Sequence, residues 1–193
     1  MNIFVLDLDP KLCAAYHCNT HTVKMITEYA QMLSTAHRVH DGIKSVHGLR
    51  ILEGETYEVI EHHTASGKSK PRAELLDGFC YRNTHENHPC CLWVQKNSAN
   101  YQWLYSLMTA LVEEWNFKFN HDKTHKAEQY FNFLKNSPKN IPHSDKKSHF
   151  FFDGPDTCKV RGDVVASYRN LYMNEKRHLA TWGDYREAPE WFK

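Results

Sequence analysis

The sequence predicts a mainly α-helical, compact domain that carries a small β-hairpin insertion. Three stretches have the apolar spacing of amphipathic helices, namely 10–38, 97–115 and 163–182. Residues 41–84 lack this spacing and contain short strand-like segments, so they are the predicted insertion. With 41% hydrophobic and 13% aromatic residues, the 193-residue chain can bury a core of its own, and we expect a single domain over 1–193.

The first helix has a clear start signal. Asp9 has the residue type of an N-cap and Pro10 suits the first helical position. The preceding segment, 2–9, has strand-like content. We expect a helix over 10–38.

The insertion is expected to hold two short strands, 57–63 and 74–82, joined by a basic tip. Cations on such a tip could contact nucleic-acid phosphates, or they could simply be solvated. The candidate backbone-binding residues of the tip are Lys68, Lys70 and Arg72.

The second half of the chain is expected to be helical with one long loop. Ser98 is the predicted N-cap of the second long helix, and a shorter helix covers 126–135. Scattered Pro, Gly and Lys predict a loop over 137–162. Asp163 is the predicted cap of the last helix, and the aromatic tail at 185–193 is expected to pack back onto the body.

Composition narrows the possible classes of protein. The net charge is +1 with 14 histidines, so nucleic-acid binding would depend on local basic patches. The N-terminal apolar run is too short for a signal peptide or a membrane anchor, and we expect a cytoplasmic protein without membrane contact. The six cysteines include no CxxC pair, which favours free thiols.

A stripe of polar side chains follows one side of the first predicted helix. At 100° per residue, its members fall within an arc of about 80° and are surrounded by apolar residues. Burying such groups without partners is costly, so the stripe predicts a pocket for a polar substrate, although it could also face solvent. The stripe comprises His17, His21, Lys24, Glu28 and Gln31.

Each member of the stripe has a possible chemical role. Glu28 could act as a general base or stabilise positive charge, and Lys24 could be a cation or an amine nucleophile. His17 and His21 could move protons or contact phosphate. With Gln31 as a substrate contact, the catalytic candidates are His17, His21, Lys24 and Glu28.

Further substrate-binding candidates lie outside the stripe. The last helix interleaves basic and aromatic residues, which suits either a nucleic-acid groove or a helix docked by its tyrosines. His88 directly precedes a proline and is not easily explained as a core residue. These candidates are Asp7, His88, Asn100, Tyr168, Arg169, Tyr172 and Lys176.

Two residues of the stripe also have the spacing of metal ligands. His17 and His21 have the i, i+4 spacing of two ligands on one helical face. The segment HENHPCC adds His85, His88, Cys90 and Cys91. Because this spacing matches no zinc motif, we expect no metal and no cofactor.

Several of these residues also carry a resemblance to a known family. The N-terminal part has a DP pair, then Lys-Met, Glu and an Ala-Gln-apolar-Leu run; an HP pair, a Trp and a Tyr-containing helix with an acidic residue follow. The chain resembles the pyrimidine-dimer DNA glycosylases of the endonuclease V type, known from phages, together with their phage and bacterial relatives. The residues concerned are Asp9, Pro10, Lys24, Met25, Glu28, Ala30–Leu33, His88, Pro89, Trp93, Tyr101, Leu104, Glu113 or Glu114, and the tail residues Pro189, Trp191 and Phe192.

The resemblance covers 10–40 and 88–120 well and the tail loosely, and it does not cover 41–84. It implies a compact helical enzyme that cleaves the N-glycosidic bond of a DNA base through an amine that forms a Schiff base. In the best-known member of that family the amine is the N-terminus, exposed by removal of Met before a small residue. Here residue 2 is Asn, so Lys24 becomes the better candidate amine.

The expected function is therefore a phage-type enzyme that acts on a flipped-out nucleobase in DNA, acting in the host cytoplasm if the chain is phage-encoded. A transferase that modifies bases in phage DNA and a non-catalytic nucleotide-binding phage protein remain alternatives. A metal-dependent hydrolase using His17 and His21 is a third. A pocket with Glu28 between Lys24 and a histidine would favour the enzyme, whereas a stripe neutralised by ion pairs without a cavity would favour binding.

Overall fold

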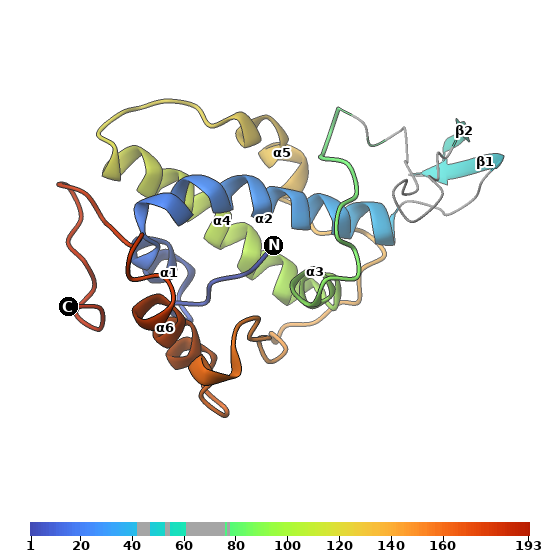
Figure 1. Cartoon of the computed structure of the whole chain (residues 1–193). Helices are drawn as coiled ribbons and strands as arrows, with labels where there is room; N and C mark the ends of the chain where they lie inside the picture. The colour runs from blue at the N-terminus through green and yellow to red at the C-terminus, as the bar shows by residue number, and fades with distance from the viewer. Residues whose placement is uncertain (42–46, 53–54, 61–75, 77) are drawn as a thin grey trace.

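The computed structural model describes residues 1–41, 47–52, 55–60, 76 and 78–193. Within these residues the chain is mainly α, as predicted, and α2 and α4 pack along each other at its centre (Figure 1). None of these helices is both long and apolar enough to cross a bilayer. The helices are α1 Pro10–Tyr16, α2 Asn19–His40, α3 Pro89–Gln95, α4 Ser98–Lys118, α5 Phe131–Leu134 and α6 Val164–Asn174.

The expected first helix is in fact two helices. Asp9 caps α1, and its side chain accepts hydrogen bonds from the backbone N–H groups of Lys11 and Leu12, as predicted. The helix is interrupted at His17, whose imidazole Nδ1 lies 2.7 Å from the Cys13 carbonyl oxygen. In an unbroken helix that carbonyl would accept from the His17 backbone N–H, so the side chain replaces the backbone donor.

Other element boundaries also differ from expectation. The side chain of Asn97, not of Ser98, caps α4 by accepting from the Asn100 N–H. The expected helix at 126–135 is a 3₁₀ helix, Lys126–Tyr130, followed by the short α5. Asp163 caps α6 as predicted, but α6 ends at Asn174 and not near 182.

The hairpin forms at another place in the insertion. Strands β1, His47–Leu52, and β2, Glu55–Ile60, pair antiparallel, with Leu49 opposite Glu58. Of the two expected strands, 57–63 overlaps β2, whereas the described residues of 74–82 lie in no strand. The expected basic tip, with Lys68, Lys70 and Arg72, lies outside the described residues.

The N-terminal segment Ile3–Leu6 is buried but is not a strand. The backbone N–H of Phe4 lies 3.3 Å from the Tyr29 hydroxyl, and Arg169 Nε donates to the Leu6 carbonyl. The C-terminal tail also packs onto the body, as expected, because the Phe192 ring lies 4.7 Å from that of Trp182. All six cysteines are free and buried.

Replacement of Leu107 by Ala is expected to lower the free energy of unfolding by about 2–5 kcal/mol, because Leu107 is fully buried on α4. The measurement is urea unfolding followed by circular dichroism. Leu92→Ala is the matched control, since Leu92 is 49% exposed on α3 and its truncation should cost less than about 1 kcal/mol. Equal losses in both variants would contradict this packing.

Candidate functional site

A pocket of about 320 Å³ lies where the N-terminal segment meets α2 and the end of α6. Its size is within the range of small-molecule sites. Half of its lining residues were predicted from the sequence, and the other half were not. The predicted ones are His21, Lys24, Glu28, His88 and Lys176; the remaining ones are Met1, Asn2, Phe4, Met25 and Asp153.

Helix α2 supplies three pocket residues at helical spacing. His21, Lys24 and Glu28 lie three and four positions apart, so they share one face of the helix. Lys24 Nζ and Glu28 Oε1 form an ion pair at 3.2 Å. The Lys24 side chain is 65% exposed, whereas Glu28 is only 16% exposed, so the amine lies at the mouth and the carboxylate deeper. The stripe is thus both ion-paired and associated with a cavity.

His21 is an uncharged residue that lines the pocket. Its ring stacks on Phe4, with the ring centroids 4.3 Å apart, and its Nδ1 lies 2.5 Å from the Tyr172 hydroxyl. Burial, together with the nearby charges of Lys176 and Lys24, lowers the pKa of His21 to about 4. At neutral pH His21 is therefore an uncharged hydrogen-bonding group.

His17 has a structural role and does not line the pocket. Its Nδ1 donates to the Cys13 carbonyl, and its Nε2 lies 3.2 Å from the Tyr29 hydroxyl. Burial lowers its pKa to about 3. With both ring nitrogens bonded inside the protein, His17 can serve neither as a catalytic group nor, with His21, as a metal ligand.

Five other predicted substrate contacts are bonded to groups of the protein itself. Arg169 binds the Asp7 carboxylate at 3.4 Å and lies over the rings of Tyr16 and Trp191. Asn100, Tyr168 and Tyr172 are fully buried, and each bonds protein groups.

Gln31, the last member of the stripe, is not among the residues lining this pocket. It lines a separate hollow with Tyr81 and Tyr130. It therefore does not share the pocket with Lys24 and Glu28.

A second amine, that of Lys118, is buried where α4 meets the start of α2. Burial lowers the pKa of Lys118 to about 8. Its Nζ donates to the carbonyl of His17 and to the hydroxyl of Thr22, so it holds the break between α1 and α2. It is not among the residues lining the pocket.

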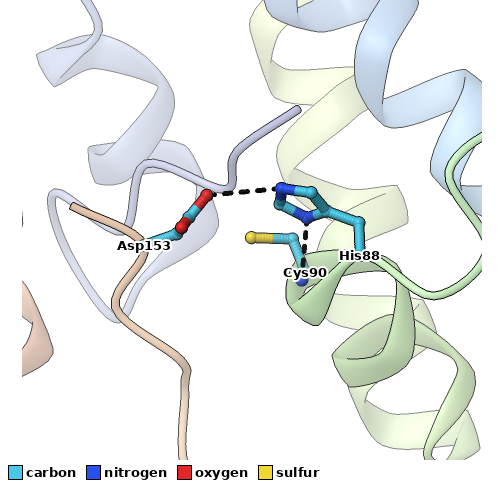
Figure 2. A group of neighbouring side chains, drawn as sticks. All are labelled: His88, Cys90 and Asp153. Atoms are coloured by element: carbon cyan, nitrogen blue, oxygen red, sulfur yellow. Dashed lines mark hydrogen bonds and ion pairs between the residues drawn. The ribbon is translucent and has the colours of Figure 1, made fainter.

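His88, Cys90 and Asp153 meet at one edge of the pocket (Figure 2). His88 caps α3, its Nδ1 accepting from the Cys90 N–H at 3.2 Å, and its Nε2 lies 3.4 Å from Asp153 Oδ2. Burial raises the pKa of Cys90 to about 12, so the free thiol is protonated. No sequence pattern marks Asp153, because it lies in an expected loop more than 60 positions from His88.

A larger hollow, of about 610 Å³, lies elsewhere, along 147–152 and 159–167. Half of its lining residues are aromatic or aliphatic, and it contains none of the predicted site residues that the structure describes. We therefore take the smaller pocket as the candidate site, because it gathers the ionisable groups that chemistry requires.

Comparison with models of known protein families, with curated proteins and with solved structures found no match for this chain. The assignment of a function therefore depends on the pocket itself.

Acid is expected to destabilise the protein through its buried histidines. In the unfolded chain His17 binds a proton near pH 6.5, but in the folded state only near pH 3, so lowering the pH below 6.5 favours unfolding. The loss is up to about 1.4 kcal/mol per pH unit for each such histidine. Chemical denaturation between pH 7 and pH 4.5 should show a shallower loss for His17→Gln than for the wild type. His143→Gln, at an exposed position, should keep the wild-type slope.

Proposed function

We propose that the chain is an enzyme of the DNA glycosylase/lyase type, which acts on a nucleobase in DNA and binds the target nucleotide in the pocket at Lys24. The observation that carries the proposal is the convergence of an amine, a carboxylate, a neutral imidazole and a second lysine on one small pocket. The resemblance to pyrimidine-dimer glycosylases supports the same reaction.

The exposure of the lining groups fits a substrate that is one unit of a polymer, with part of it inside the pocket and the rest outside. Lys24 is largely exposed while His21 and Phe4 are buried, so charge lies at the mouth and aromatic surface lies within. A flipped nucleotide has the same order, because its phosphates stay outside while its base enters. Lys24 and Lys176 would face the phosphate and sugar, and the stacked Phe4 and His21 rings would border the base.

The chemistry requires a neutral amine and a group that accepts its proton. Glu28, 3.2 Å from the Lys24 amine, can take that proton. The amine electron pair then forms a bond to the sugar C1′, while the glycosidic bond breaks and its electrons leave with the base, which takes a proton from water. Opening of the sugar ring gives a Schiff base on Lys24, and the nearby carboxylate stabilises this cation.

Met1 also lines the pocket, so its amine is the alternative nucleophile. The resemblance implies an N-terminal amine, whereas the helical face places Lys24 beside Glu28. The two amines give adducts on different peptides, which makes them separable by experiment.

Borohydride trapping tests the reaction. The protein is incubated with duplexes carrying normal, damaged and modified pyrimidines, with and without borohydride, and both DNA and protein are analysed by mass spectrometry. A reduced adduct on the Lys24 peptide, or an abasic product, is the expected result. Unchanged masses on every substrate would contradict the proposal and would favour base modification with a donor, or nucleotide binding alone.

Lys24→Arg and Glu28→Gln are expected to lower turnover at least about a hundredfold, because one removes the reactive amine and the other its proton acceptor. The melting temperature should change by only a few degrees, since an i, i+4 ion pair on a helix contributes about 0.3–0.5 kcal/mol. Thermal unfolding and the trapping assay are run on the same samples. Lys96→Arg, on a residue outside the pocket, should leave both unchanged.

A further inference from the structure

We propose that His88, Cys90 and Asp153 form a zinc site at the edge of this pocket, with the fourth coordination position open to the pocket. The proposal does not depend on the glycosylase reaction. It differs from the expectation from the sequence, which was that the chain binds no metal.

The three ligand atoms have the right chemistry and are already gathered. One ligand atom from each of the three residues lies within 4.8 Å of the other two (Figure 2). Among the described residues, this is the group of His, Cys and acidic side chains that is close enough together to hold a metal ion. A nitrogen, a sulfur and a carboxylate oxygen are the donors that Zn²⁺ takes in proteins, and a thiolate disfavours the hard ions Mg²⁺ and Ca²⁺.

The distance between His88 and Asp153 fits a shared metal better than a hydrogen bond. Nε2 and Oδ2 are 3.4 Å apart, beyond the usual 2.7–3.2 Å of an N–H···O bond. Two ligands at about 2.0–2.2 Å from a tetrahedral zinc ion are separated by about 3.4 Å. The ion would thus take the place of the Nε2 proton between the two side chains.

Asp153 is held in place by the fold. Its backbone N–H donates to the hydroxyl of Tyr168, and its carbonyl accepts from the Asn2 side chain at 2.7 Å. The Tyr168 hydroxyl in turn donates to Asn2 Oδ1, which also lies 3.8 Å from Cys90 Sγ. Partners that fix the ligands in this way are typical of metal sites.

Metal binding requires two local changes. The Cys90 thiol loses its proton to solvent, and the sulfur moves to about 3.6 Å from the other ligand atoms. His88 binds through Nε2 and carries its remaining proton on Nδ1, so its cap bond to the Cys90 N–H is lost. Pro89, at the first position of α3, needs no such partner and keeps the helix start.

Three protein ligands leave one position of a tetrahedral ion vacant for water or substrate. His88 and Asp153 both line the pocket, whereas Cys90 is 1% exposed behind them. The vacant position therefore points toward the pocket, where an anionic oxygen of a ligand could bind it.

Cobalt(II) spectroscopy on the full chain tests the site. The metal-free protein is titrated with Co²⁺, and we expect one equivalent to bind with a sulfur-to-cobalt charge-transfer band that Zn²⁺ abolishes. The band should be absent in Cys90→Ala and retained in Cys158→Ala, which removes an equally buried thiol elsewhere. Absence of the band in the wild type, or its persistence in Cys90→Ala, would overturn the proposal.

A second variant guards against misfolding of Cys90→Ala. The Asp153 side chain is 39% exposed and its fold-stabilising bonds come from its backbone, so Asp153→Asn should fold normally. It should bind Co²⁺ at least about tenfold more weakly than the wild type, and unchanged affinity would exclude Asp153 as a ligand. Inorganic phosphate should shift the visible cobalt bands of the wild type; an unshifted spectrum would exclude the open fourth position.

Discussion

The buried N-terminal segment constrains the rest of the structure. Ile3–Leu6 runs through the core without a neighbouring strand, so its backbone groups need hydrogen-bond partners of another kind. Side chains provide several of them: the Tyr29 hydroxyl lies against the Phe4 N–H, Cys13 Sγ donates to the Phe4 carbonyl and accepts from the Leu6 N–H, and Arg169 bonds the Leu6 carbonyl. Three helices are thereby tied to one strand-like segment.

The need of this buried segment for hydrogen-bond partners explains why several of the polar residues predicted as site residues have a structural role. Tyr29, which lies against the Phe4 N–H, also contacts His17, and the His17 ring in turn ends α1 by bonding Cys13. The sequence pattern could not separate this buried network from a substrate pocket, because both place polar groups among apolar ones at helical spacing. Within the stripe, His17 belongs to this buried network, whereas His21, Lys24 and Glu28 line the pocket.

The features predicted correctly from the sequence are those that depend on residues close together in the chain. Apolar periodicity located the long helices, and the caps at Asp9 and Asp163 were right because an N-cap needs only neighbouring backbone groups. The pairing of β1 was missed, since short strands with weak patterns leave register open. Asp153 was missed because its place beside His88 depends on Tyr168 and Asn2, two contacts between segments far apart in the chain.

The electrostatics of the pocket divide the work among its groups. Burial and the charges of Lys24 and Lys176 keep His21 uncharged at neutral pH, so it cannot deliver a proton as an imidazolium. A cationic intermediate at Lys24 would maintain that effect, because it keeps a positive charge beside the same ring. Under the proposed reaction, the group that receives the amine proton and stabilises the cation is therefore the Glu28 carboxylate, and His21 orients the base by hydrogen bonding and by its stack on Phe4.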